Sequence, residues 1–327
     1  MPEASPVRRA AGARGHQGIR AVSRGRTVAA ALALGTALLV LAGCGGSATT
    51  PGSGTAQPGS PTSGAAQPSP SGTTSQVPQP AHTVVVVLEN HAFSEVIGNP
   101  AAPFINMLAS HGALFTRSYA ITHPSEPNYL ALFSGSTHGV SDDGCPEEFT
   151  APNLAADMIS AGKTFAGYSE DLPAVGSQVC SAGEYARKHV PWTDFRNVPG
   201  SVSKPFTSFP APDLASLPDV SFVIPNLCND MHDCSVATGD SWLRARLGGY
   251  VSWAMTHHSL LIVTWDEDDG SAGNQIPTIF VGQMVKPGRY SELINHYSVL
   301  ATIEAAYGLP RDGQAASAKP ITDVWKP

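Results

Sequence analysis

The apolar positions between residues 82 and 309 alternate between short continuous runs and longer runs with helical spacing. The run HTVVVVLEN, residues 82–90, is typical of a parallel strand that is buried on both faces of a sheet. Helical patterns separate it from later strands, so the chain predicts an α/β fold with a mainly parallel sheet and helices on both faces. The predicted strands are 82–90, 113–120, 164–170, 219–226, 259–268 and 276–282, and the predicted helices are 100–112, 127–135, 153–163, 239–258 and 296–309.

Residues 1–43 have the pattern of an export signal and not that of a folded segment. Six arginines precede the apolar run TVAAALALGTALLVLAGC, which ends at Cys44. The segment LAGC resembles the lipobox of bacterial lipoproteins, which implies lipidation of Cys44 and anchoring of the exported protein to the outer face of the cell membrane. An uncleaved membrane anchor and an ordinary secretory signal are the alternatives, and both also export the domain.

Residues 44–80 hold no charged residue and consist almost entirely of Gly, Ser, Thr, Pro, Ala and Gln. Such a segment buries too little apolar surface to offset the entropy of ordering it, so we expect a disordered tether. Residues 81–327 remain for the folded part, and their number suits one α/β domain.

The chain becomes more acidic when the signal is removed. The formal net charge is −7, and loss of six arginines and Glu3 removes a net +5 and leaves −12. This charge disfavours nucleic acid as a partner and attraction to an anionic bilayer. An anionic substrate therefore needs a local positive centre, and a metal ion is the simplest one in a chain with few Lys and Arg residues.

Four cysteines follow Cys44, and an even number in an exported chain is typical of disulfides. The simplest pairing joins Cys145 to Cys180 and Cys228 to Cys234, although three pairings are possible. A metal site made of thiolates is the alternative, but the spacings do not match C-x-x-C.

Polar residues follow the carboxyl ends of the predicted strands, where ligands bind in open α/β sheets. Glu89 and Asn90 follow the first strand, and Asp266 and Glu267 follow the apolar run LLIVTW. Their oxygens suit a hard divalent cation. Singly, such residues also fit a strand-end turn or a solvated acidic loop. Other residues of this kind are His123, Ser125, Asn226, Asp230 and His232.

Ser125 lies between Pro124 and Pro127 in the stretch ITHPSEPNYLALFSG, residues 121–135. A proline fixes its own φ and restricts the residue before it, so this serine is held in a rigid turn. A cation beside the hydroxyl would make it a better nucleophile and would neutralise an incoming phosphate. The alternative is a helix N-cap ahead of PNYLALF.

Five segments occur together in the order VVLENHAFSEVIG, GALFTRSYAITHPSEPNYLALFSG, NDMHDCSVATGDSWL, LLIVTWDEDDG and INHYSVLATIEAAYGL. They resemble the bacterial acid phosphatase and phospholipase C phosphoesterase family, a branch of the alkaline-phosphatase-like superfold, from about residue 82 to residue 309. The resemblance implies one divalent metal ion. Its ligands here would be Glu89, Asn90, Asp266 and Glu267.

The resemblance also implies that Ser125 is the nucleophile. His232 and His296 would contact the phosphate or protonate the leaving group. Candidate substrate-binding residues are Asn90, His123 and Asn128, and candidate supporting residues are Asp230 and Asp240.

The predicted reaction is hydrolysis of a small phosphate ester through a phosphoserine, with a phosphomonoester as the preferred substrate. A phospholipase C-type phosphodiesterase stays open, and a solute-binding lipoprotein without catalysis is a more distant alternative. Many phospholipase C members read DEHGG where this chain reads DEDDG, so Asp268 weakens any transfer of their substrate preference. An α/β-hydrolase esterase would need G-x-S-x-G, and the chain has no such pentapeptide.

Overall fold

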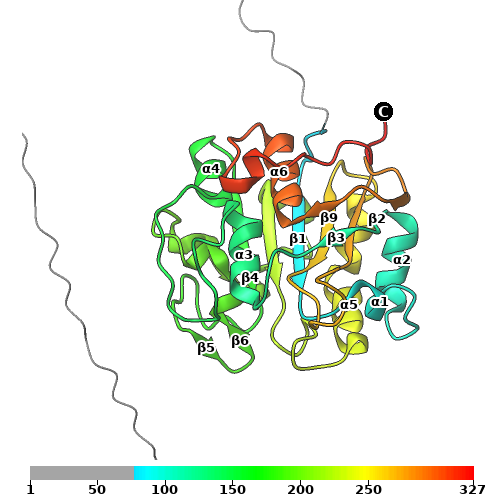
Figure 1. The fold of residues 1–327 in the computed structure, drawn as a ribbon. Coiled ribbons are helices and arrows are strands. Elements are labelled where there is room, and N and C mark those ends of the chain that lie inside the picture. The colour runs from blue at the N-terminus through cyan, green and yellow to red at the C-terminus, as the bar shows by residue number, and fades with distance from the viewer. Residues whose placement is uncertain (1–76) are drawn as a thin grey trace, which may run out of the picture. The chain divides into compact units, whose positions relative to one another are not determined.

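The computed structural model describes residues 77–327, which form a central eight-stranded sheet with helices on both faces (Figure 1). The predicted signal peptide, Cys44 and all of the predicted tether except residues 77–80 lie outside the described residues. Val77 is already buried in the core, at 3% exposure. No helix among the described residues is long and apolar enough to cross a membrane.

The strand order in the sheet is β11-β2-β10-β9-β1-β8-β4-β7. The central strands are parallel, and β10 runs antiparallel to both of its neighbours. This arrangement confirms the predicted mainly parallel α/β fold. The strands of this sheet are β1 (Thr83–Leu88), β2 (Ala113–Phe115), β4 (Phe165–Ser169), β7 (Ser203–Pro205), β8 (Val220–Ile224), β9 (Leu260–Trp265), β10 (Thr278–Gly282) and β11 (Gly288–Tyr290).

Four short strands lie outside the main sheet and form two separate pairs. They are β3 (Ser118–Tyr119) with β12 (Ile294–Asn295), and β5 (Ser181–Ala182) with β6 (Tyr185–Ala186). The α-helices are α1 (Phe93–Val96), α2 (Pro103–His111), α3 (Ser125–Ser134), α4 (Leu154–Ser160), α5 (Val236–Ala254) and α6 (His296–Tyr307). The 3-10 helices are η1 (Arg187–His189), η2 (Pro191–Thr193), η3 (Gly200–Val202), η4 (Phe206–Ser208), η5 (Leu214–Ser216) and η6 (Gly313–Ala316).

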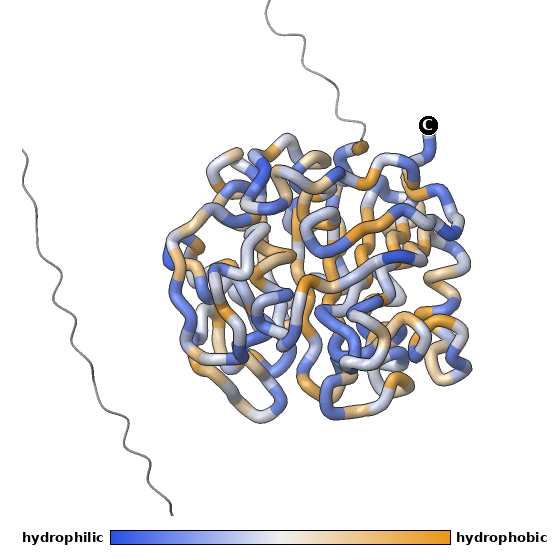
Figure 2. The backbone as a smooth tube through the Cα atoms, viewed as in Figure 1, coloured by the Kyte–Doolittle hydropathy of each residue, from blue (hydrophilic) through white to orange (hydrophobic). Residues whose placement is uncertain are grey.

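The continuous valines of β1 serve two hydrophobic cores, one on each face of the sheet. Val85 and Val87 pack with side chains of α3, α4 and α6, whereas Val84 and Val86 pack with side chains of α2 and α5. A strand covered on both faces needs apolar side chains at successive positions, which explains why the run does not alternate. Figure 2 shows the same pattern, because the central strands are coloured hydrophobic and many of the connecting loops hydrophilic.

The prediction of one continuous strand over 113–120 is wrong, because a turn interrupts it. The chain turns at Thr116 and Arg117, so β2 joins the main sheet while β3 pairs with β12 in a different sheet. Thr116 bonds to Tyr290 through both its amide and its hydroxyl, and this contact with a distant segment holds the turn.

The segment between β4 and β8 has no helix longer than a 3-10 turn. It supplies β7, a three-residue edge strand that ends at Pro205, and an edge position tolerates proline. The disulfide between Cys145 and Cys180 ties this segment to the loop after α3, and a second disulfide joins Cys228 to Cys234 in the loop after β8.

Candidate active site

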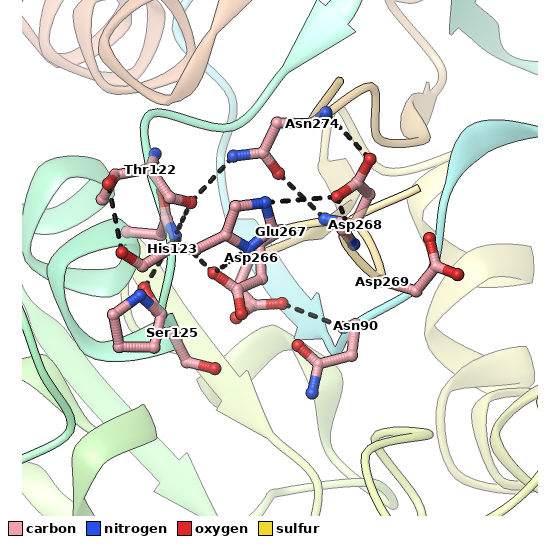
Figure 3. Close-up of polar contacts among 12 residues, drawn as sticks. Asn90, Thr122, His123, Ser125, Asp266, Glu267, Asp268, Asp269 and Asn274 are labelled. Carbon is pink, nitrogen blue, oxygen red and sulfur yellow. Dashed lines mark hydrogen bonds and ion pairs between the residues drawn. The ribbon is translucent and has the colours of Figure 1, made fainter. Parts of the chain in front are cut away.

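The two predicted pairs of metal ligands, Glu89 with Asn90 and Asp266 with Glu267, lie side by side because of strand register. Strands β1 and β9 are parallel neighbours in which Leu88 pairs with Trp265. The next residues, Glu89 and Asp266, therefore leave the sheet at the same edge. The backbone N–H of Asn90 donates to Asp266 Oδ1 at 3.1 Å, and this bond ties the two chain turns together (Figure 3).

Ser125 meets this acidic cluster from the first turn of α3. Its hydroxyl donates to Glu89 Oε2 at 3.1 Å, and the residue is 2% exposed. Pro124, and not Ser125, is the N-cap of the helix, with an extended backbone. The hydroxyl is therefore not used to cap the helix and points to the acids instead.

Asn128 organises the turn that carries Ser125. Its side-chain oxygen accepts the amides of Ile121 and Thr122, at 2.9 and 3.0 Å. Its amide group donates to Thr122 O, Pro124 O and Glu267 Oε2 at 2.8, 3.1 and 3.1 Å. The side chain thus links the serine turn to the acidic end of β9.

The carboxylates of the cluster are almost completely buried, and burial raises their pKa values. The pKa of Glu89 is raised well above its ordinary value by burial and then by the charges of Asp266 and Asp230. Burial and Glu267 raise the pKa of Asp266 to about 7, and burial and Asp143 raise that of Glu267 to about 7. Asp266 Oδ2 is buried and accepts no hydrogen bond from the described residues. Such a set of crowded oxygens fits a hard divalent cation, which would offset their mutual repulsion.

His189 is a site residue that sequence reasoning missed. It lies in η1 at 1% exposure, with Nε2 3.3 Å from Glu89 Oε1 and Nδ1 3.4 Å from Asp230 Oδ2. Its ring stacks on Tyr129, whose hydroxyl donates to Glu89 Oε1. The irregular segment around His189 has no periodic pattern, so no local sequence feature indicated this position.

His232 approaches the same place from the loop closed by the Cys228–Cys234 disulfide. Its backbone N–H donates to Asp230 Oδ1 at 2.8 Å, and its Nδ1 lies 2.7 Å from Asp233 Oδ1. One ligand atom each from Glu89, His189 and His232 lie within 4.8 Å of one another, so this trio could also hold a metal ion. The trio shares only Glu89 with the predicted ligand set.

His296, the first residue of α6, is 1% exposed and contacts the backbone of the acidic cluster. Its Nε2 lies 2.7 Å from the backbone carbonyl oxygen of Asp266, to which it donates. Burial lowers the pKa of His296 to about 4, although this hydrogen bond raises it in part. A neutral imidazole therefore supports the turn at Asp266 from the side of α6.

His123 lies at the exposed side of the cluster, and 44% of its side chain is exposed. Its ring nitrogens lie 3.0 Å from Glu267 Oε2 and 3.3 Å from Asp268 Oδ1 (Figure 3). Asp268 accepts the amides of Gly270, Ala272 and Asn274 at 2.7 to 2.8 Å. Asp268 therefore closes its own loop.

Asp240 does not join the site. Its carboxylate accepts the amides of Phe104 and Ile105 at 3.2 and 2.8 Å, so it caps the start of α2 from α5. The suggestion that it supports the site was wrong. Asp230, by contrast, is buried beside His189 and His232.

Comparison with known proteins shows the family to which the chain belongs. The model of the phosphoesterase family matches residues 99–310. The chain belongs to this family. It is 59% identical over 247 residues to the phosphatidylinositol-3-phosphatase of Mycobacterium tuberculosis, a match that covers 75% of this chain and 83% of that protein.

Fungal enzymes are more distant relatives. The chain is 33% identical over 228 residues to an acid phosphatase of Aspergillus fumigatus, covering 63% of this chain and 51% of that enzyme. It is 32% identical over 252 residues to the phosphate-repressible acid phosphatase of Penicillium chrysogenum, covering 71% and 60%. The matched region thus spans little more than half of each fungal enzyme.

Solved structures confirm the alkaline-phosphatase-like fold. An alkaline phosphatase superfamily protein from Vibrio parahaemolyticus aligns with a TM-score of 0.54 at 12% identity, over 76% of this chain and 72% of that one. The lipoteichoic acid synthase LtaP of Listeria monocytogenes aligns with a TM-score of 0.53 at 9% identity, over 77% of both chains. The family match and the named relatives show that the chain is a phosphoric ester hydrolase, as the motifs predicted.

Proposed function

We propose that the protein is a metal-dependent phosphomonoesterase that works through a phosphoserine on Ser125. The observation that carries the proposal is the hydrogen bond from Ser125 to Glu89, within a buried group of carboxylates at the ends of β1 and β9. The names of the relatives support a monoester, because they are acid phosphatases and a phosphatidylinositol-3-phosphatase.

The metal ion would be held by Glu89, Asn90, Asp266 and Glu267, whose oxygens suit a hard cation. When bound, the ion would stabilise the serine alkoxide and the negative charge of the phosphoryl group. The residues around it keep these ligands in place. Asn128 donates to Glu267, Tyr129 donates to Glu89, and His296 donates to the backbone of Asp266.

In the first step Ser125 Oγ attacks phosphorus, a bond from this oxygen to phosphorus forms, and the bond from phosphorus to the leaving oxygen breaks. The hydroxyl proton leaves along the hydrogen bond to Glu89. His232 gives a proton to the leaving alcohol, since it is the partly exposed histidine beside Asp230 and His189. In the second step water attacks the phosphoserine and gives a proton back to His232. The bond from phosphorus to Ser125 Oγ breaks, the proton held by Glu89 returns to Oγ, and inorganic phosphate is released.

The test compares hydrolysis of p-nitrophenyl phosphate by the wild type, by Ser125→Ala and by Ser110→Ala. Ser110 is exposed on α2, where its hydroxyl bonds to a backbone carbonyl of its own helix, and it serves as the matched control. We expect Ser125→Ala to lower kcat by at least about 1,000-fold, as removal of a catalytic nucleophile does. Extended dialysis against a chelator should abolish activity, and a divalent cation should restore it.

Acid quenching during turnover should trap phosphate on the peptide that contains Ser125, as mass spectrometry would show. Full activity in both the alanine variant and the chelated protein would refute the proposal. Phosphate release from phosphatidylinositol 3-phosphate, with no phosphocholine release from phosphatidylcholine, would identify the enzyme as a monoesterase. This result would exclude the phospholipase C alternative.

We also propose that the enzyme is exported and anchored by a lipid on Cys44, with a tether from Cys44 to residue 76. The catalytic domain then begins at Val77, which is buried in the core, four residues before the predicted start at Ala81. The signal-like residues 1–43 and the two disulfides of the folded part support export. Metabolic labelling with palmitate should mark the membrane-bound wild type, whereas Cys44→Ala should be unlabelled and lost to the medium. Labelling of Cys44→Ala at the wild-type level would refute the anchor.

A further inference from the structure

The candidate active site is rich in acids, yet it has to accept a phosphoryl group with negative charge. Arg187 and Lys188 are the two basic residues next to His189, and they have different environments. Arg187 is 5% exposed and donates to the Asp194 carboxylate, the Thr193 hydroxyl and carbonyl, Gln178 O and Glu147 O. Its donors are used to hold the irregular segment together.

Lys188 is arranged differently. Its ammonium donates to Asp143 Oδ2 at 2.8 Å, and 21% of its side chain is exposed. An ammonium group has three N–H donors. Among the described residues the bond to Asp143 uses one of them, so two donors remain for a ligand.

Contacts on both sides of Lys188 lead to the reacting serine and to the acids. The other oxygen of Asp143 accepts the backbone N–H of Glu126 at 3.0 Å, and Glu126 directly follows Ser125. His189, the next residue after Lys188, lies 3.3 Å from Glu89. Only one carboxylate and two hydrogen bonds separate the ammonium from the first turn of α3.

The charge of Lys188 affects the carboxylates of the cluster. It lowers the pKa values of Glu267 and Asp230, in opposition to the larger effect of burial. Burial by itself would lower the pKa of Lys188, but the hydrogen bond and charge of Asp143 raise it above the ordinary value. The ion pair with Asp143 thus favours the charged form of the side chain.

The segments that carry this pair are cross-linked. Asp143 lies two residues before Cys145, Lys188 lies eight residues after Cys180, and the two cysteines form a disulfide. The cross-link keeps the Asp143 loop beside η1. A surface ion pair would otherwise hold two loops only weakly.

We propose that Lys188 is the phosphate-binding cation of this site, positioned by Asp143, and that it contacts the non-bridging oxygens of the phosphoryl group during transfer. This inference rests on the proposed function. Lys188 stabilises charge on the phosphoryl group from η1, the same short helix whose His189 contacts Glu89 at the end of β1. A fixed ammonium at this position would stabilise the transition state more than the ground state, as preorganised donors do.

The test uses Lys188→Met, which removes the charge and keeps the chain length, Lys188→Arg, which keeps the charge, and Lys286→Met as a matched control. Lys286 is exposed in the turn between β10 and β11, at the far edge of the sheet from β7. We expect Lys188→Met to lower kcat/KM for p-nitrophenyl phosphate by roughly 100-fold, in the range seen when one transition-state donor is removed. Lys188→Arg should recover part of this loss, and Lys286→Met should match the wild type.

Competitive inhibition by inorganic phosphate separates this role from a structural one. Lys188→Met should raise the inhibition constant for phosphate at least about 10-fold, which is the loss of one charge-assisted hydrogen bond. A variant with a lower melting temperature but an unchanged inhibition constant would overturn the inference. If the wild type hydrolyses no phosphate ester, the proposed function fails, and calorimetric titration with inorganic phosphate then decides whether Lys188 binds phosphate.

Discussion

Glu304 provides a test of the electrostatics of the fold at a place remote from the proposed chemistry. It lies in α6 at 1% exposure, where Oε1 accepts the backbone N–H of Asp312 at 2.9 Å and Oε2 lies 3.7 Å from Arg311. Burial, together with the charge of Asp312, raises the pKa of Glu304 to about 8, against the lowering effects of the Asp312 amide and Arg311. The folded protein therefore keeps a proton on Glu304 at pH values where the unfolded chain has lost it.

The sign of the pH dependence follows from this difference. Between the ordinary pKa of 4.5 and about 8 the folded state binds more protons at this position than the unfolded state, so the free energy of unfolding falls as pH rises. The contribution is fully present below the ordinary pKa and is lost as the pH passes through the folded pKa. Each pKa unit corresponds to about 1.4 kcal/mol, so the loss between pH 5 and pH 8 is on the order of 3 kcal/mol.

Glu304→Gln removes this titration and keeps an oxygen for the amide of Asp312. We expect the variant to lose less stability than the wild type as pH rises from 5 to 8, measured by urea unfolding with tryptophan fluorescence at each pH. Some pH dependence will remain in the variant, because burial and Asp157 also raise the pKa of Asp312, to about 7. Glu184→Gln, at an exposed position, is the matched control and should follow the wild type. A constant difference between Glu304→Gln and wild type at all pH values would refute the reasoning.

Three further substitutions probe the site and the core. Tyr129→Phe removes the hydroxyl that donates to Glu89 and should lower kcat by about 10-fold, with the phosphate inhibition constant measured alongside. Asp268→Asn leaves one oxygen for amides that two oxygens now accept, so the loop over 268–274 should become sensitive to limited proteolysis and KM should rise several-fold. Gly167→Ala would place a Cβ 2.0 Å from the Trp192 ring and should lower the free energy of unfolding by about 1 to 3 kcal/mol or more, as chemical denaturation would show.

The parts of the fold that could be predicted are those in which local pattern and burial agree. The valines of β1 indicated a strand buried on both faces, and the structure places that strand between β8 and β9 at the centre of the sheet. Strands β1 and β9 are parallel neighbours that end at the same edge of the sheet, and this alone brings Glu89 and Asp266 together. Strand β3 could not be predicted in its correct sheet, because its partner β12 lies about 175 residues further along the chain.

In the candidate site, too, some residues could be predicted from local sequence and others could not. Acids at strand ends follow from the sheet, whereas His189 and Lys188 come from an irregular segment held by contacts to distant residues. Glu89 lies 100 residues before His189, and Asp230 lies 41 residues after it. No window of local sequence contains such information, so sequence reasoning assigned the positive charge of the site to a metal ion alone.

The position of Ser125 depends on more contacts than the flanking prolines suggested. The flanking prolines were expected to hold the hydroxyl in place, and Pro124 does take the N-cap position that a serine often occupies. Asn128, however, makes five hydrogen bonds that join residues 121, 122 and 124 to Glu267. Because one side chain connects the serine turn with the acidic end of β9, the distance between Ser125 Oγ and the acids depends on Asn128 as well as on the prolines. Asn128→Ala should therefore lower kcat even though the substitution leaves the ring constraints of Pro124 and Pro127 unchanged, and wild-type kcat in this variant would assign the geometry to the prolines alone.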